Sequence, residues 1–189
     1  MAMKKITAET AIEITQLYKA INPEAIENLS AEDKPEHHLK YLIDKEYFED
    51  AIVFLAHCLP KREAVWWGCI CVRNVTNDET SPDDITELQW AEKWVQKPEE
   101  KIRRLCGDLA EKGRYRSPYD WVAAAAFWSG DSISSKGEPI VEPGPYLYAH
   151  AIAGATLTAV GMGDVDDRTA LFEKFLQQGI DIAQGGMGT

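Results

Sequence analysis

The sequence predicts an all-α protein, a compact bundle of about seven to nine helices in which buried apolar helices are wrapped by amphipathic ones. Five prolines each precede an apolar or amphipathic run of helical length: Pro60, Pro82, Pro98, Pro118 and Pro145. Three of these runs close on a glycine, at Gly113, Gly130 and Gly163. Proline suits a helix start because its missing N–H has no partner there, and glycine suits a left-handed exit. No run alternates apolar and polar residues for long enough to indicate a half-buried strand.

The first third of the chain alternates helical and polar stretches. A helix is predicted over residues 8–21, with Thr7 as its cap, because apolar residues recur there every three or four positions. A polar stretch over 22–35 is predicted to be a loop with a short turn over 23–29. Residues 38–43 and 47–59 then form one broken helix or two.

The middle of the chain holds the clearest helix starts. The helix after Pro60 is apolar nearly all round, which places it in the middle of the fold. Ser81 and Ser117 each precede a proline and have a carboxylate three residues later, which predicts a capped helix start at both sites. The helices opened by Pro82 and Pro98 carry an apolar stripe and are predicted to be outer helices.

The last third contains two alanine-rich segments. Residues 121–128 include four consecutive alanines, and the helix over 146–160 is rich in alanine and glycine. Because small side chains allow close approach, these two helices are predicted to pack together. Between them, residues 129–143 form an irregular connection of unusual length. A final helix begins at the acidic cluster over 164–167.

The composition is that of a single globular domain spanning residues 1–189. The chain is 45% hydrophobic and 10% aromatic, which excludes a disordered protein. Only residues 1–6 and 185–189 are expected to be frayed, since chain ends are poorly ordered unless they are tied down.

The charge and the cysteines indicate a cytoplasmic protein. A net charge of −11, from 31 acidic and 20 basic residues, disfavours binding to nucleic acid or to an anionic membrane. No apolar run reaches the roughly 20 residues of a membrane span, and the N-terminus resembles no secretory signal. The cysteines form no C-x-x-C pair and are typical of reduced, packed thiols: Cys58, Cys69, Cys71 and Cys106.

The sequence contains none of the common catalytic or nucleotide-binding motifs. It lacks G-x-x-x-x-G-K-[ST], G-x-S-x-G, H-E-x-x-H and E-x-x-H, so neither a metal nor another cofactor is expected. His57 and Cys58 are adjacent, but consecutive helical residues diverge by about 100°, which favours a packed thiol over a catalytic pair. His37 and His38 are expected on the surface, and His150 in the core.

The irregular connection offers one catalytic alternative. Ser129, Asp131 and the serines that follow could combine with His150 into a serine–histidine–aspartate site, which would make the protein a small hydrolase-like enzyme. A serine oxygen within about 3 Å of a histidine nitrogen would support that alternative. Without a nucleophile motif, a binding loop bordered by Trp128 is favoured instead.

Two further groups of residues indicate binding to another protein. Arg103 and Arg104 belong to a basic cluster in an otherwise acidic chain, and the arginine fork suits carboxylates on a partner. Most of the six tryptophans are expected in the core. Trp90, which falls beside the apolar stripe of its helix, is the exception. Exposed tryptophans could instead meet across a two-fold axis in a structural homo-oligomer.

One block of the chain resembles the signature of an uncharacterised, all-helical bacterial family: Leu59-Pro60-Lys61-Arg62-Glu63-Ala64-Val65-Trp66-Trp67. Further matches include the Arg103-Arg104 pair and the run Ala125-Ala126-Phe127-Trp128-Ser129-Gly130. Members of that family occur beside type VI secretion genes in proteobacteria, and the family supplies no catalytic residues. The charges at 61–63 would form an internal ion pair or a recognition site at the surface.

The leading hypothesis is a non-enzymatic, cytoplasmic adaptor that binds another protein, such as a secreted effector or a secretion component. Its candidate binding residues are Lys61, Arg62, Glu63, Trp66, Trp90, Arg103, Arg104, Trp128, Ser129 and Asp131. The hydrolase-like enzyme and the homo-oligomer are the alternatives.

Overall fold

The computed structural model describes residues 3–188, and within that range it contains ten α-helices, one short 3₁₀ helix and no strand. The elements are α1 (Ala11–Thr15), α2 (Glu24–Glu27), α3 (Pro35–Asp44), α4 (Phe48–Cys58), α5 (Lys61–Val75), α6 (Pro82–Gln96), α7 (Glu100–Gly113), α8 (Pro118–Trp128), α9 (Leu147–Met162), η1 (Val165–Asp167) and α10 (Arg168–Gln184). The all-α prediction is confirmed. The helix count exceeds the predicted seven to nine because the short turn predicted over 23–29 is a four-residue helix, α2.

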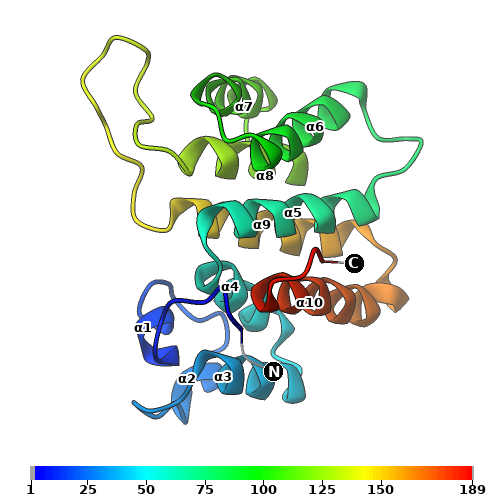
Figure 1. Cartoon of the computed structure of the whole chain (residues 1–189). Coiled ribbons are helices and arrows are strands. Elements are labelled where there is room, and N and C mark those ends of the chain that lie inside the picture. Colours follow the sequence, from blue (N-terminus) through cyan, green and yellow to red (C-terminus); the bar gives the residue numbers. More distant parts are fainter. Residues whose placement is uncertain (1–2, 189) are drawn as a thin grey trace.

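The helices form three layers, and the middle layer is the pair α5 and α9 (Figure 1). Helices α6, α7 and α8 lie on one side of this pair, and α4 and α10 lie on the other. Helices α1 and α3 pack against α4. The three helices predicted to be inner, α5, α8 and α9, contact one another, and the amphipathic helices pack around them.

Small residues permit the closest helix contacts. Ala123–Ala126 of α8 are fully buried, and α8 packs against α9, as predicted for the two alanine-rich segments. On the other side of α5, the buried indole of Trp67 donates its Nε1–H to the carbonyl of Phe175 in α10 at 2.8 Å. Gly179 of α10 lies so close that a Cβ there would be 2.6 Å from Cδ2 of Leu55 and 2.8 Å from Cε2 of Trp67.

The capped helix starts are confirmed. The Ser81 hydroxyl accepts a hydrogen bond from the N–H of Asp84 at 3.1 Å, and the Ser117 hydroxyl accepts one from the N–H of Asp120 at 3.1 Å. Asp120 in turn accepts from the N–H of Ser117 at 2.9 Å, which completes a capping box at α8. Helices α7 and α9 begin two residues after the prolines predicted to open them, because the intervening residue is the N-cap in both.

The first helix is much shorter than predicted. Helix α1 has five residues, where the apolar periodicity predicted a helix over 8–21. The backbone N–H groups of Ile21 and Asn22 donate to the carboxylate of Asp50 in α4, at 2.8 and 3.0 Å. Since Asp50 is buried, it needs these donors, and the chain leaves the helical path to supply them.

The glycines at helix ends serve a purpose that the sequence did not predict. None of the three has a left-handed backbone: Gly113, Gly130 and Gly163. The left-handed exit of α7 falls on Arg114, whose φ is 64°. A Cβ at Gly113 would collide with the Asp120 side chain, and a Cβ at Gly130 would collide with that of Arg103. These glycines therefore make room for neighbouring side chains.

The described parts of both chain ends are hydrogen-bonded, where fraying was predicted. The N–H of Lys5 donates to the carbonyl of Ala183 at 2.9 Å, and the indole N–H of Trp66 donates to the carbonyl of Met187 at 3.0 Å. A half-buried indole needs an acceptor, and the C-terminal segment supplies it. Residues 1, 2 and 189, which were also predicted to be frayed, lie outside the described residues.

All four cysteines are free and buried, as predicted for packed thiols. Over residues 3–188, no three His, Cys, Asp or Glu side chains are grouped in a way that could hold a metal ion. In the same range, no helix combines the length and the apolar character that crossing a bilayer requires.

A buried carboxyl group lies between α6 and α8. Glu87 is only 3% exposed, and its Oε2 atom has no hydrogen-bond partner among the described residues. Burial, and then the neighbouring Asp120 carboxylate, raises the pKa of Glu87 to about 8. Glu87 is therefore largely protonated at neutral pH, and its carboxyl group can donate a hydrogen bond to the Asp120 carboxylate.

Replacement of Gly179 by alanine is expected to destabilise the protein by about 1–3 kcal/mol, because the new methyl group must displace Leu55 or Trp67. Chemical denaturation measures this change. Gly154→Ala in α9 is the matched control, since nothing lies within 4 Å of a Cβ at that position. Alanine is the better helix former, so the control is expected to gain about 0.5–1 kcal/mol. Equal effects at the two sites would contradict the close packing of α10.

The raised pKa of Glu87 predicts a pH-dependent stability. Between the ordinary value of 4.5 and the folded value of about 8, the folded state holds a proton that the unfolded state releases. The stabilisation is complete below about pH 4.5 and is lost as the pH rises through about 8. Glu87→Gln, which mimics the protonated acid, should lessen the fall in Tm over this range. Glu111→Gln, at an exposed site on α7, is the control. A Tm profile that Glu87→Gln leaves unchanged contradicts the prediction.

Candidate functional site

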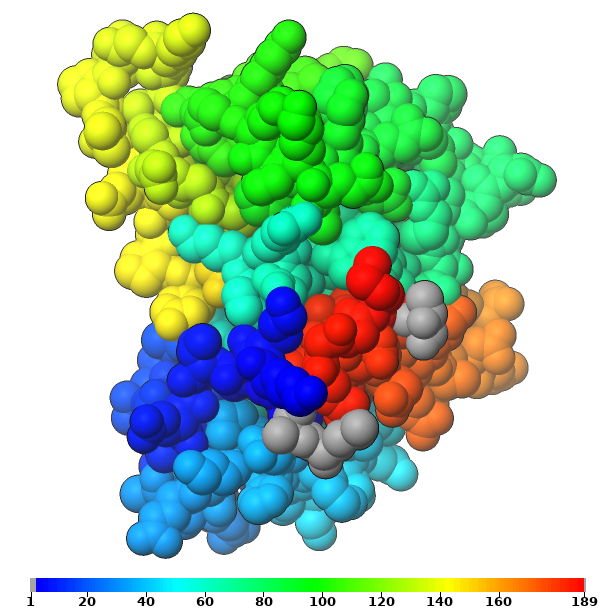
Figure 2. All heavy atoms as spheres, viewed as in Figure 1, coloured from blue at the N-terminus to red at the C-terminus, as the bar shows by residue number. Residues whose placement is uncertain are grey.

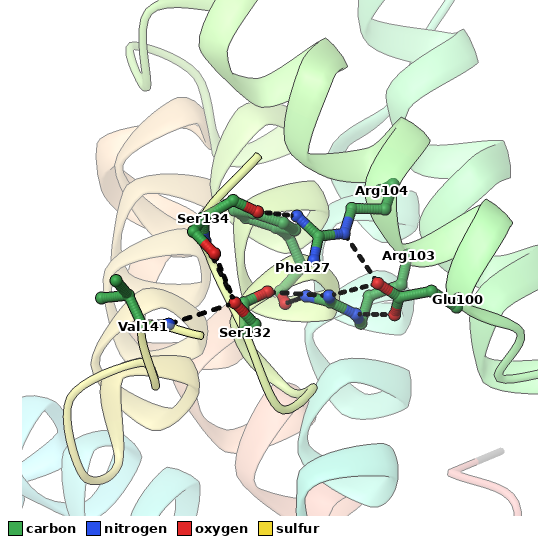
Figure 3. Close-up of polar contacts among 7 residues, drawn as sticks. All are labelled: Glu100, Arg103, Arg104, Phe127, Ser132, Ser134 and Val141. Carbon is green, nitrogen blue, oxygen red and sulfur yellow. Dashed lines mark hydrogen bonds and ion pairs between the residues drawn. The ribbon is translucent and has the colours of Figure 1, made fainter. Parts of the chain in front are cut away.

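The buried guanidinium of Arg103 is the centre of the candidate site. Arg103 lies on α7, is only 3% exposed, and is held by the Glu100 carboxylate at 2.6 Å (Figure 3). Its Nη1 donates to the carbonyl of Phe127 at the end of α8, and its Nη2 donates to the carbonyl of Ser132 at 2.8 Å. Gly130 leaves the space through which the side chain passes. Glu100 thus neutralises the positive charge of Arg103, and the guanidinium donates its hydrogen bonds to acceptors within the protein.

Arg104 completes the attachment of the loop. Its Nε donates to Glu100 at 2.7 Å, and its Nη1 donates to the carbonyl of Ser134 (Figure 3). The hydrogen bonds from Arg103, and then those from Arg104, lower the pKa of Glu100 to about 2. Glu100 therefore stays ionised and holds both arginines toward the loop. Both arginines thus meet a carboxylate of the same chain, and their binding to carboxylates of a partner stays a prediction.

The loop that follows Ser129 is folded back on itself. The N–H of Ile133 donates to the carbonyl of Val141 at 2.8 Å, and the hydroxyls of Ser132 and Ser134 lie 2.8 Å apart. The far part of the loop projects from one corner of the molecule, in yellow in Figure 2. Ile140, which directly precedes Val141, is 76% exposed. The two arginines thus hold an otherwise isolated loop against α7.

A groove lies beside this attachment, and we call it the α6–α7 groove. Its volume is about 990 Å³. Trp90 of α6 and Ile102 and Leu105 of α7 give it an apolar floor. Five basic side chains surround that floor: Lys93, Lys97, Lys101, Arg104 and Lys136. Only three acidic residues line it, Glu99, Glu100 and Asp108. The groove is therefore a basic surface on an acidic protein.

Two of the rim cations are available to a partner. Lys97 pairs with Glu99 at 2.6 Å, and the ammonium of Lys93 lies 4.3 Å from the centroid of the Trp90 ring. Lys101 and Lys136 form no ion pair with any residue that the structure describes. Trp90 is half-buried, but so are Trp66, Trp121 and Trp128, so Trp90 is not the exception that the sequence predicted. The floor residues Ile102 and Leu105 belong to the apolar stripe of the helix after Pro98, and the sequence alone did not mark them as binding residues.

The other candidate residues near the loop have structural contacts. Trp128 stacks on Tyr115 with centroids 5.9 Å apart and planes at 15°. The hydroxyl of Ser129 donates to the carbonyl of Ala125 at 2.7 Å inside α8. Asp131 is exposed and lies outside the α6–α7 groove. Of the six tryptophans, Trp67 and Trp94 are buried and the other four are half-buried, and the homo-oligomer alternative stays a prediction.

The hydrolase-like arrangement is not assembled in the described residues. No hydrogen bond joins His150 to a serine there, and the Ser129 hydroxyl is occupied within its helix. His150 is exposed rather than in the core, and its ring lies 4.6 Å from that of His57 in α4. His38, predicted on the surface, is buried against the ring of Phe54 at 4.9 Å. Burial raises the pKa of the Cys58 thiol, which disfavours a thiolate.

The block at the start of α5 reaches the surface and joins distant segments. Arg62 donates to the carbonyl of Val95 at 2.5 Å, and Glu63 pairs with Lys5 at 2.9 Å. Together with Trp66 these residues line a cleft of about 370 Å³ that also borders the C-terminal segment. The charges at 61–63 form no internal ion pair with one another; Lys61 is exposed. Of the candidate binding residues, Arg62, Glu63 and Trp66 thus line this cleft. Trp90 and Arg104 line the α6–α7 groove, which is separate from it.

Comparison with known proteins identifies the family. A model described as a family of unknown function, DUF6931, matches residues 38–183. The chain belongs to this family. The DUF6931 match includes all of α4 to α9, and so the α5 block and the α6–α7 groove, whereas α1 and α2 precede it. The predicted membership of an uncharacterised family is confirmed. No curated protein and no solved structure matches the chain.

Arg103→Ala is expected to release the loop, because it removes the donors to Phe127 and Ser132 and one partner of Glu100. Hydrogen exchange in residues 131–142 should become at least about tenfold faster, and stability should fall by about 2–3 kcal/mol. Arg103→Lys keeps the charge but loses the fork, so it should be intermediate. Lys101→Ala, an exposed neighbour, is the control. Unchanged exchange in Arg103→Ala would show that the loop is held by other contacts.

Proposed function

We propose that this protein is a non-enzymatic adaptor that binds an acidic, amphipathic helix of another protein in the α6–α7 groove. The observation that supports this function is an apolar floor with a basic rim on a protein whose net charge is −11. An apolar groove of this kind accepts a helix that presents apolar side chains every three or four residues. Acidic residues on the edges of that helix face the rim lysines.

The geometry favours protein binding over the other functions considered. Ile102 and Leu105 lie one helical turn apart on α7, and Trp90 of α6 lines the same groove. Large aromatic and apolar side chains supply most of the affinity at such surfaces. The surrounding cations increase the association rate and make it depend on salt.

The family resemblance adds a cellular setting to this proposal. In that setting the protein is cytoplasmic and holds a secreted effector or a component of a type VI secretion system. The secretion link comes from the resemblance of the signature at 59–67 and not from the groove. It therefore indicates which partners to test first.

A labelled acidic amphipathic peptide that forms a helix should bind the protein with a Kd on the order of 10 μM, measured by fluorescence anisotropy. Lys101→Glu reverses one free rim charge and should weaken binding by about tenfold. Trp90→Ala, which removes part of the floor, should weaken it by a similar factor. Raising the salt concentration should reduce the affinity of the unaltered protein.

Lys45→Glu is the matched control, since it makes the same charge change at the end of α3, in the layer opposite the groove. This variant should bind the acidic peptide normally. Equal binding of a basic amphipathic peptide, or equal loss in both lysine variants, would contradict the proposal. A pull-down from the native host, compared between the unaltered protein and Lys101→Glu, then identifies partners that depend on the groove.

A further inference from the structure

The loop between α8 and α9 carries an exposed segment that is both apolar and acidic. The run Glu138-Pro139-Ile140-Val141-Glu142 places two apolar side chains between two carboxylates, and we call it the 138–142 segment. All five residues are exposed. Seven large apolar side chains are exposed among the described residues, and only Ile140 and Val141 are adjacent in the chain. Neither glutamate forms an ion pair with any residue that the structure describes, so the whole segment is available for a contact.

The 138–142 segment is held in place before any partner arrives. Gly137, whose φ is 94°, turns the chain just ahead of it. Pro139 restricts the backbone near its start. At its other end, the carbonyl of Val141 accepts the hydrogen bond from the N–H of Ile133. A segment that is already ordered loses less conformational freedom when it binds.

The segment lies next to the α6–α7 groove of its own chain without entering it. Lys136 lines the groove, and Ile140 follows four residues later, so their Cα atoms are at most about 14 Å apart. No residue of the 138–142 segment lines that groove. In Figure 3, Ser132 lies between Val141 and the two arginines, which places Val141 on the side of the loop away from α7.

The segment and the groove are complementary in polarity and charge. The groove has an apolar floor that includes Trp90 and Leu105, and its rim is basic. Ile140 is two residues from each glutamate, so in an extended segment the three side chains point to one face. Ile140 then contacts the floor, and the carboxylates on either side of it meet rim lysines. The apolar contact supplies most of the affinity, and the charges set the register.

A second copy of the chain is the partner that carries the matching surface. Because Lys136 belongs to the loop and also lines the groove, the two complementary surfaces are neighbours on one molecule. A two-fold axis beside them brings each loop to the groove of the other copy, so both contacts form at once. The net charge of −11 on each copy opposes the association and keeps it weak.

We propose that the 138–142 segment of one copy occupies the α6–α7 groove of a second copy, reciprocally, in a two-fold dimer. This inference rests on the proposed function, since it takes the same groove as the binding surface. In the dimer, the segment stands in for the acidic helix of the partner. That helix must displace the segment, so dimer formation and partner binding compete.

The first test is sedimentation velocity of the full chain from about 5 to about 500 μM. A reversible monomer–dimer equilibrium is expected, with a Kd on the order of 100 μM. Ile140→Ser removes the apolar contact from an exposed site and should weaken dimerisation at least about tenfold. Val165→Ser is the matched control, since Val165 in η1 is 71% exposed and lies outside both the loop and the groove. It should dimerise normally.

An exchange of charges tests the pairing of the two surfaces. Glu138→Lys with Glu142→Lys reverses the segment, and Lys93→Glu with Lys101→Glu reverses the rim. All four side chains are exposed, so both variants should fold. Each variant alone should dimerise at least about tenfold more weakly. An equimolar mixture should dimerise again, because the mixed dimer has one contact with the original charges and one with both charges reversed.

Three outcomes would each overturn the proposal: a monomer at every concentration, equal effects of Ile140→Ser and Val165→Ser, or a mixture of the charge variants that stays monomeric. The acidic peptide separates this inference from the proposed function. A monomer that binds the peptide contradicts the dimer alone. A dimer that meets every expectation above, in a protein that does not bind the peptide, contradicts the adaptor function alone.

Discussion

The arrangement of this protein depends on how closely its inner helices approach one another. A Cβ at Gly68 of α5 would lie 2.6 Å from Cδ1 of Ile152 in α9 and 3.2 Å from Cγ1 of Val122 in α8. The alanines at 123–126 of α8 are completely buried. At protein packing density, helices that meet through glycine and alanine gain many backbone contacts but leave no space for larger side chains. The positions of the outer helices, and of the α6–α7 groove between two of them, depend on this contact.

The second constraint is the burial of a positive charge. Arg103 is tolerated in the protein because Glu100 neutralises it and two carbonyl groups accept its hydrogens. A buried ion pair of this kind contributes more to a specific arrangement than to stability, since the desolvation of both groups offsets much of their attraction. Here the specific arrangement is the position of a long loop beside α7. Because these hydrogen bonds hold the loop beside α7, they also bring Lys136 to the rim of the α6–α7 groove.

The features predicted correctly from the sequence are those with local causes. The capping box of Ser117 and Asp120 involves residues three apart, and the inner position of α8 follows from its uninterrupted apolar composition. The incorrect predictions concern features that depend on contacts with residues distant in the sequence. The chain does not continue as a helix after α1 because its backbone N–H groups donate to Asp50. Residue 130 is a glycine because a Cβ there would collide with the Arg103 side chain. Neither cause is visible within a few residues of the site affected.

The sequence by itself determined an all-helical fold, its main helix starts, and which helices are inner, because hydrogen bonds within a few residues and apolar periodicity control these features. It also indicated Arg103, Arg104 and Trp90, although not what they do. Only the tertiary structure decided that the arginines bind Glu100 and the loop, and that Trp90 shares a groove with Leu105. These features require surfaces from separate helices to converge, and long-range packing rather than local preference brings them together.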